Sequence, residues 1–408
     1  MLDRTEADVV IAGGGILGIC AAYHLLDSGA RRVVVVEADT PGAATSGAGA
    51  GFVGLWAAGY ADFFADAGLE LEQYGIDFYR RLAAEDPSIE CRSNGNLFLG
   101  TTEEGCRLWI DTILQHPLAP AAVRALTAPE VTEITGGVIA ADTVLRGALH
   151  PGGIQVSAGR ATRALARRVA ARGAEVRART RLTGLITAGG RVEGVQTEGG
   201  DIYARTVVLA CGAWCNEVLA ETGYRAPLLR MIATRVISRP SGVSGSMPTV
   251  MVPDLFGLWL REHRGGLTWG NGDGYSPLFE LGGSLGADGQ PRREELVERL
   301  DVALTPKLRK LVPAHDTSIG WWLQGVPCMT PDRRFLAGPV PGVNGLYLLA
   351  GDNEAGVTHG PGLGRLLAEV ILTGGSQWLD PAPYRPDRFQ PAQFPTDESV
   401  LAAMPSRR

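Results

Sequence analysis

A glycine-rich turn between a short apolar run and a helical segment constrains this chain more than any other feature. Residues 8–37 read DVVIAGGGILGICAAYHLLDSGARRVVVVE, which predicts a strand, a turn, a helix and a second strand. Gly13 permits the tight turn, Gly15 lets the backbone approach a pyrophosphate, and Gly18 lets the helix pack against the strand. The N–H groups and the positive dipole end at the helix start favour phosphate. The stretch therefore predicts a dinucleotide-binding unit.

Glu37 closes this unit at the end of the second strand. A carboxylate there can accept hydrogen bonds from both hydroxyls of an adenosine ribose and repels a 2′-phosphate, so NADP is disfavoured. A glycine motif alone is a weak signal, but here the strand, the helix and the acid are all in register. The motif leaves open whether the dinucleotide is NAD or FAD.

Composition limits the class of protein. The 408 residues are 45% apolar and 20% charged with a net charge of -6, which is ordinary for a soluble globular enzyme with two or three domains. No cluster of Lys and Arg alternates with aromatic residues, so no nucleic-acid partner is expected. Arg163, Arg167, Arg168 and Arg172 share one side of an expected helix, which we interpret as a solvated face.

Cysteine usage and the N-terminus bear on location. The six cysteines show no C-x-x-C and no metal-ligand spacing, which predicts reduced thiols in a cytoplasm and no bound metal. Met1 leads directly into the first strand, so no signal peptide is expected. No apolar run approaches the ~20 residues that cross a bilayer, so no membrane span is expected.

Two further stretches suit one elongated ligand. Residues 38–52 are mostly small, which favours a backbone lying against a flat ligand, with hydroxyls from Thr45 and Ser46; a flexible linker is the alternative. Residues 351–364 form a second glycine-rich turn after a buried strand, with Pro361 at the expected first position of a helix that stops at Gly374. Such a helix start suits a flavin, because reduction places negative charge on the N1–C2=O edge of the ring.

The remaining chain alternates helices with two kinds of strand. Helical spacing marks residues 66–84, 156–171 and 292–312. A buried strand at 206–209 is expected to return to the first sheet, and residues 248–271 alternate apolar and polar positions as a long hairpin. We expect that hairpin to form the floor of a second domain.

Several segments together resemble the D-amino acid oxidase superfamily of FAD-dependent amine oxidoreductases, in particular glycine oxidases and monomeric sarcosine oxidases. The matching segments are GGGILG with Glu37, 44–51, 180–182, 210–214, 258–270, 329–332 and 351–364. The resemblance implies an α/β fold: a Rossmann-like FAD-binding domain interleaved with an α+β substrate domain on a mainly antiparallel sheet. The domains would be 1–86, 147–222 and 318–380 for FAD, 87–146 and 223–317 for substrate, and 381–408 as a C-terminal tail.

The resemblance also implies how FAD lies. Its adenosine would meet Glu37 and the backbone of Leu182, and its ring would rest against the small-residue segment and the C-terminal helix start. Hydride would pass from the carbon bearing nitrogen to flavin N5, and the imine would hydrolyse in water. The expected contacts to non-covalent FAD are Gly13, Gly15, Ile16, Leu17, Gly18, Glu37, Ala38, Thr45, Ser46, Gly51, Phe52, Leu182, Cys211, Gly212, Trp214, Gly325, Asp352, Gly356, Val357 and Thr358.

Departures from the family pattern concern substrate and oxygen. Pro327 stands where many members have the arginine that holds a substrate carboxylate, and Gly325 stands where sarcosine oxidases have the cysteine that binds flavin covalently. Cys328 is displaced by three positions, which leaves a covalent flavin as a minor alternative. Thr268 and Thr358 replace two lysines of sarcosine oxidases. These losses point to an unusual substrate, larger or without a free carboxylate.

Three residues remain as candidates for the chemistry. Arg261, on the expected hairpin, can bind a carboxylate bidentately, with a surface ion pair to Glu262 as the alternative. His359, expected just before the C-terminal helix, could act beside flavin or substrate or cap the helix. Trp259 is expected to line an apolar pocket or to belong to the core.

The sequence therefore predicts an oxidase of a C–N bond in an amine or amino acid, with reduced flavin reoxidised by O2 or another acceptor. One alternative is a dehydrogenase of a 2-hydroxy acid or amino acid that passes electrons to a quinone or partner protein. Another is a protein that uses FAD structurally or without net redox change. Substrate identity, stereochemistry and oligomeric state are left open.

Overall fold

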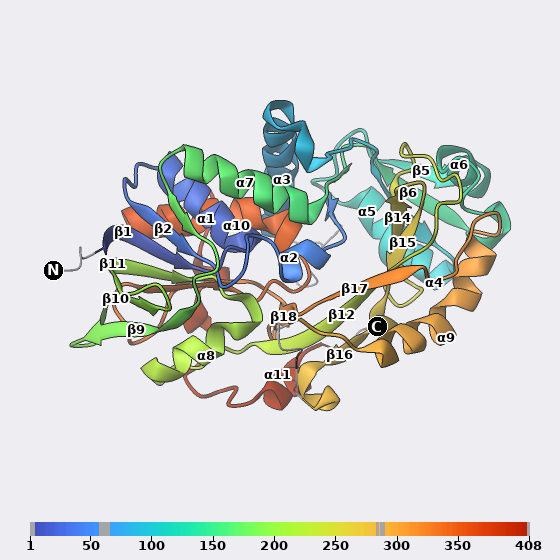
Figure 1. Ribbon diagram of the computed structural model, residues 1–408. Helices are drawn as coiled ribbons and strands as arrows, with labels where there is room; N and C mark the ends of the chain where they lie inside the picture. The colour runs from blue at the N-terminus through green and yellow to red at the C-terminus, as the bar shows by residue number, and fades with distance from the viewer. Residues whose placement is uncertain (1–4, 57–65, 283–284, 286–289, 406–408) are drawn as a thin grey trace.

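A computed structural model describes residues 5–56, 66–282, 285 and 290–405. Within these residues two large sheets form two bodies that lie side by side (Figure 1). The predicted α/β fold class with a second, mainly antiparallel sheet is confirmed.

The first sheet carries the glycine motif. Its main path has the order β19-β20-β11-β1-β2-β8, parallel from β20 to β8, with β10 and β9 added antiparallel to β11. The strand predicted at 206–209 is confirmed as a member of this sheet, and the buried strand predicted before the second glycine-rich turn also belongs to it. Its strands are β1 (Thr5–Ala12), β2 (Val33–Val36), β8 (Glu175–Arg177), β9 (Leu182–Ala188), β10 (Arg191–Thr197), β11 (Ile202–Leu209), β19 (Leu336–Pro339) and β20 (Leu346–Ala350).

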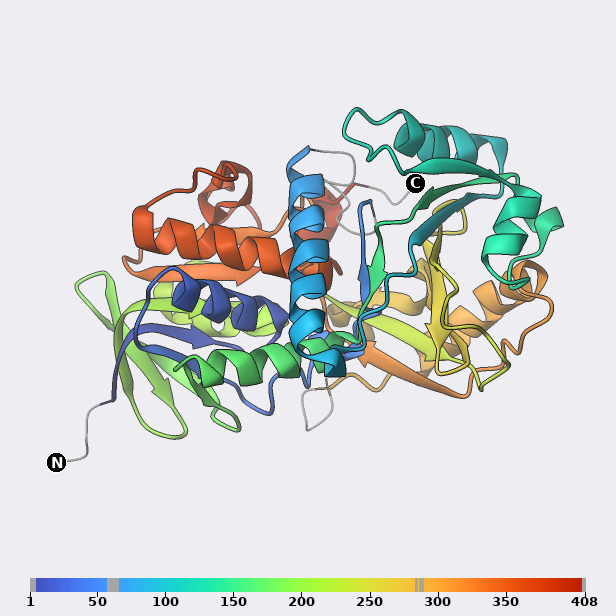
Figure 2. The ribbon, with the colours of Figure 1, turned by 90° about the horizontal axis from the view of Figure 1, so that it is seen from above.

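Helices cover one face of this sheet, and the hairpin β9–β10 and α8 lie beyond the other face (Figure 1). Alternation along β1 explains the two layers: Val9 and Ile11 pack in the helical core, whereas Val10 and Ala12 pack in the opposite core. Figure 2 shows α3 standing at the boundary between the two bodies. The helices of this body are α1 (Ile16–Asp27), α2 (Thr45–Ala48), α3 (Asp66–Glu85), α7 (Ala158–Ala171), α8 (Cys215–Leu219) and α10 (Gly356–Thr373).

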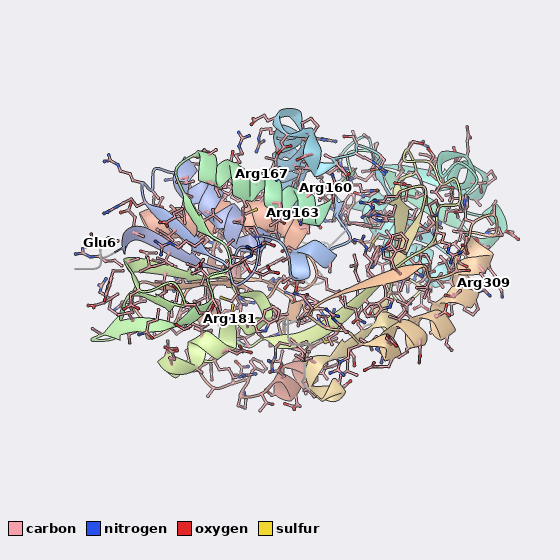
Figure 3. All side chains as sticks on the ribbon, viewed as in Figure 1. Glu6, Arg160, Arg163, Arg167, Arg181 and Arg309 are labelled. Atoms are coloured by element: carbon pink, nitrogen blue, oxygen red, sulfur yellow. The ribbon has the colours of Figure 1, made fainter. Side chains whose placement is uncertain are left out.

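The arginine-rich helix is α7. Arg160, Arg163 and Arg167 lie along its outer side (Figure 3) and are exposed. Arg167 pairs with Asp86 at 3.2 Å. Of the four predicted arginines, Arg163, Arg167 and Arg172 are exposed, as a solvated face requires, whereas Arg168 is partly buried and pairs with Glu85.

The second sheet has the order β16-β12-β15-β14-β13-β4-β6-β5, with β17 and β18 also paired to β12, and β13–β4 as its parallel pair. The predicted hairpin is confirmed as β13, β14 and β15, and α9 packs against the same core. The strands are β4 (Asn96–Gly100), β5 (Arg124–Thr127), β6 (Arg146–His150), β12 (Leu229–Ile237), β13 (Thr249–Val252), β14 (Leu258–His263), β15 (Gly266–Gly270), β16 (Tyr275–Pro277), β17 (Trp321–Gly325) and β18 (Cys328–Met329). Smaller elements are the pair β3 (Phe52–Val53) and β7 (Ile154–Gln155), with helices α4 (Glu103–Gly105), α5 (Asp111–Gln115), α6 (Ala128–Ile134), α9 (Glu294–Leu311) and α11 (Asp397–Ala403).

Strand membership differs from the predicted domain boundaries at two places. Residues 147–150 belong to β6 and residues 321–329 hold β17 and β18, so both stretches lie in the second sheet. They are held there because β6 pairs with β4 and β17 pairs with β12. The chain therefore returns to the first body later than 147 and 318. The remaining division into domains stays a prediction.

Candidate active site

One cavity of about 1420 Å³ is lined by residues of both bodies. Pockets for drug-sized ligands measure roughly 300–1,000 Å³, so this cavity has room for an extended dinucleotide and a substrate. It brings together all the predicted cofactor residues except Gly18: Gly13, Gly15, Ile16, Leu17, Glu37, Ala38, Thr45, Ser46, Gly51, Phe52, Leu182, Cys211, Gly212, Trp214, Gly325, Asp352, Gly356, Val357 and Thr358. Their individual contacts to FAD stay a prediction.

The glycine turn has the geometry that an anion needs. Gly13 has φ +110°, and a Cβ there would overlap the carbonyl oxygen of Ala210. A Cβ at Gly18 would overlap the carbonyl oxygen of Gly13, so Gly18 supports close packing and does not reach the cavity. Helix α1 starts at Ile16, whose N–H donates to Ser46 Oγ at 3.0 Å, and it has no acidic residue in its first turn. Its positive end is therefore open to phosphate.

Glu37 is fixed at the same end of the cavity. One carboxylate oxygen accepts the Gly14 N–H at 2.7 Å and the other accepts the Asp39 N–H at 2.9 Å. Leu182 lines the same cavity. The acid thus ties the second strand to the glycine turn, where a ribose would lie.

The small-residue segment is a wall held from two sides, which argues against a flexible linker. Thr45 Oγ1 accepts the Val326 N–H at 3.0 Å, next to β17. Thr358 Oγ1 donates to the Phe52 carbonyl at 2.8 Å, from α10. Segments distant in the sequence therefore meet around this loop.

The predicted start of the C-terminal helix was wrong. Helix α10 begins at Gly356, and Pro361 lies inside it. A proline removes the N–H that would bond the carbonyl four residues earlier, and here that carbonyl belongs to Val357. It accepts the Tyr79 hydroxyl at 2.9 Å instead. The helix can therefore continue through Pro361, and its uncapped N-terminus lines the cavity.

His359 consequently lies within the first turns of α10 and neither precedes nor caps it. Its side chain is fully buried, and its ring centroid lies 5.1 Å from that of Phe335. It does not line the cavity. Its placement gives no support to a role beside flavin or substrate.

Arg261 lies behind the cavity wall. Its side chain is 4% exposed, and its guanidinium donates to the carbonyls of Ala50 at 2.5 Å and Glu262 at 2.7 Å. The Glu262 carboxylate pairs with Arg92. The surface ion pair between Arg261 and Glu262 is therefore corrected, because Arg261 is buried and contacts backbone. Trp259, on the same strand, does line the cavity.

Arg235 is one of the cavity residues that the sequence analysis missed. It lies on β12, is 7% exposed, lines the cavity, and donates through Nη1 to the Gly49 carbonyl at 2.6 Å. Its Nε and Nη2 have no hydrogen-bond partner among the described residues. Burial lowers its pKa to about 10, so it remains a cation at neutral pH. The available signal was a single charge among the uncharged residues of the segment 231–237, MIATRVI.

Cys328 is fully buried and does not line the cavity; its thiol faces Asp352 at 3.4 Å. This placement supports non-covalent FAD. Over the described ranges, no group of three or more His, Cys, Asp or Glu is placed to hold a metal ion. No helix in the described part of the chain is long and apolar enough to cross a membrane.

Asp352 should make stability depend on pH. It accepts the N–H groups of Cys328 at 3.1 Å and Glu354 at 3.0 Å, yet burial raises its pKa to about 6. A folded-state pKa above the unfolded value of 3.8 means that stability falls as pH rises from about 4 to about 6. Asp352→Asn should therefore gain on the order of 2 kcal/mol relative to wild type between pH 4 and pH 7.

The measurement is the melting temperature of flavin-free protein at both pH values. Any pH-independent cost of the asparagine cancels when the two differences are compared. An equal difference at pH 4 and pH 7 would contradict the raised pKa.

A parallel sheet with a glycine turn, a second uncapped helix start, and one cavity running into an antiparallel sheet define a dinucleotide-dependent oxidoreductase. Neither helix start has an acidic residue in its first turn, which fits an anionic dinucleotide such as FAD. Residues 8–370 match the family described as FAD dependent oxidoreductase (DAO). The chain belongs to this family, and the resemblance seen in the sequence is confirmed.

Relatives and solved structures agree with the family. The chain is 27% identical over 386 residues to glycine oxidase of Pseudomonas putida, covering 93% of this chain and 98% of that protein. It is 28% identical to 4-methylaminobutanoate oxidase (formaldehyde-forming) of Paenarthrobacter nicotinovorans, covering 91% of this chain but 44% of that protein. The crystal structure of L-proline dehydrogenase from P. horikoshii has a TM-score of 0.81 at 22% identity, covering 95% of this chain and 98% of that chain.

Proposed function

We propose that this protein oxidises the C–N bond of an amine or amino acid with non-covalently bound FAD. FAD supplies the hydride acceptor, and the imine product takes up water to give a carbonyl compound and an amine. The observation that supports this proposal is one large cavity whose lining includes both helix starts and strands of the antiparallel sheet. The names of two relatives, glycine oxidase and 4-methylaminobutanoate oxidase, both describe an amine that carries a carboxylate.

Arg235 replaces Arg261 as the proposed substrate anchor. It lines the cavity beside the small-residue wall, and its Nη2, which has no hydrogen-bond partner among the described residues, can donate to a carboxylate. Trp259 and Met251 pair across β14 and β13 and line the same cavity, which gives an apolar floor for the substrate chain. Correct placement of an uncharged donor nitrogen is the main requirement, so no strong general base is assigned.

Anaerobic mixing of the flavin-loaded protein with a panel of amines, amino acids and 2-hydroxy acids tests the proposal. At least one amine or amino acid should bleach the flavin band near its visible maximum. Bleaching by 2-hydroxy acids alone would shift the substrate class, and no bleaching by any compound would favour a flavin without a redox role.

The same flavin-loaded protein can be used to identify the electron acceptor. We propose O2 as the acceptor, as in the relatives named oxidases, and the six unpaired thiols support a cytoplasmic location. Reduced protein exposed to air should form peroxide as fast as it turns over. Slow reoxidation in air with fast reoxidation by a quinone would identify a dehydrogenase instead.

A further inference from the structure

Two neighbouring peptide groups in the cavity wall are each held by a buried guanidinium. Arg235 Nη1 donates to the Gly49 carbonyl at 2.6 Å, and Arg261 Nε donates to the Ala50 carbonyl at 2.5 Å. These carbonyls belong to the peptide groups Gly49–Ala50 and Ala50–Gly51. Both arginines come from the second sheet, so they approach the loop from the same body.

The N–H groups of the same two peptides are available to a ligand. The described chain has no cis peptide bond, so each N–H points opposite to its carbonyl and therefore away from the guanidinium. Within the described residues, neither the Ala50 N–H nor the Gly51 N–H donates a hydrogen bond. Both residues line the cavity. A charged donor on the carbonyl side polarises the peptide and strengthens donation by its N–H.

The charge arrangement favours an electron-rich partner for this pair. Neither guanidinium forms an ion pair with a carboxylate among the described residues, although both side chains are at least nine-tenths buried. Burial, followed by repulsion from Arg235, lowers the pKa of Arg261 to about 9, so both stay charged at neutral pH. Buried charges without counterions are costly, and negative charge arriving in the cavity offsets that cost.

The position of the loop identifies the part of the ligand concerned. A Cβ at Gly49 would lie 3.4 Å from Val357 Cγ2, at the start of α10. The wall also faces Gly325, since a Cβ there would lie 3.3 Å from Thr45 Cα. These are the segments expected to hold the flavin ring.

We propose that Arg235 and Arg261 act as positioning residues through these two peptides. They fix and polarise the Ala50 and Gly51 N–H groups, which bind the electron-rich edge of the flavin ring and stabilise the negative charge that the ring gains on reduction. This inference rests on the proposed use of FAD but not on any particular amine substrate. Arg261 tests it cleanly, because Arg261 does not line the cavity and can reach the ring only through the loop.

The experiment uses flavin-loaded Arg261→Met and measures two properties without an amine substrate: the midpoint potential of the flavin and the dissociation constant of sulfite, which adds to the ring and leaves it negatively charged. We expect the potential to fall and sulfite to bind about tenfold more weakly, as for the loss of one charge-assisted hydrogen bond. A purely structural role for Arg261 would lower the melting temperature but leave both properties unchanged.

Arg264→Met is the matched control, since Arg264 is an exposed cation of the same hairpin. It should leave sulfite affinity within twofold of wild type. An effect equal to that of Arg261→Met would show that any nearby positive charge acts on the flavin, and would overturn the proposed action through the Ala50 and Gly51 peptides. If Arg261→Met does not retain flavin, Arg261→Lys decides. Lysine keeps the charge without the planar fork, so sulfite must bind it more weakly than wild type, and wild-type affinity would overturn the proposal. Failure of wild-type protein to bind FAD would instead refute the proposed function.

Discussion

Gly13→Ala should yield a colourless protein that has lost most of its affinity for FAD. Gly13 has φ +110°, which an alanine adopts only with strain, and its Cβ would lie 2.7 Å from the carbonyl carbon of Ala210. The atoms that the new Cβ would strike are backbone atoms of Ala210, directly after β11. The clash can therefore be relieved only by moving the adjacent strands β1 and β11 apart. We expect at least about a 100-fold loss of FAD affinity, or ~2.7 kcal/mol.

Flavin absorbance after gel filtration and titration of the flavin-free protein with FAD measure this effect. Gly375→Ala is the matched control, because a Cβ there meets nothing within 4 Å and the φ of Gly375 lies outside the left-handed region. The control should bind FAD as wild type does. A yellow Gly13→Ala protein with wild-type affinity would show that no cofactor lies against this turn.

Arg235→Met should selectively impair substrates that carry a carboxylate. Removing one partner of a buried charge pair costs roughly 2–5 kcal/mol, so the efficiency of flavin reduction should fall about 100-fold or more for the preferred amino acid. The efficiency of Arg235→Lys should lie between those of wild type and Arg235→Met, since an ammonium group keeps the charge but cannot offer the planar fork. Stopped-flow reduction under anaerobic conditions gives the substrate dissociation constant and the limiting rate separately.

The control for Arg235→Met is a second substrate, not a second variant. Arg235 also holds the Gly49 carbonyl, so its loss can affect every substrate through the loop. The amine obtained by removing the carboxyl group from the preferred amino acid reports that shared effect alone. The ratio of the two efficiencies should therefore collapse in Arg235→Met. An equal loss of efficiency for both compounds would show that Arg235 does not bind the carboxylate and acts only through the loop.

The sequence predicted local features well because they depend on neighbouring residues. The positive φ at Gly13, the close packing at Gly18 and the acid at Glu37 are fixed by a strand, a turn and a helix that follow one another in the chain. Periodicity alone also predicted α3 and the hairpin β13–β15. The prediction of where α10 starts was wrong, because the Tyr79 hydroxyl that bonds the Val357 carbonyl comes from 278 residues earlier in the chain.

The sequence by itself thus determined that this protein holds a dinucleotide and shares the fold of an FAD-dependent family. Only the tertiary structure decided that Arg235, and not Arg261, lines the cavity. Trp259 and Arg261 share one face of β14, but a loop 211 residues earlier in the chain covers Arg261 and leaves Trp259 at the cavity. The adjoining strand β12 places Arg235 at the same wall. Hydrogen bonds between segments so distant in sequence leave no periodic pattern, and so Arg235 could be found at the cavity only in the folded structure.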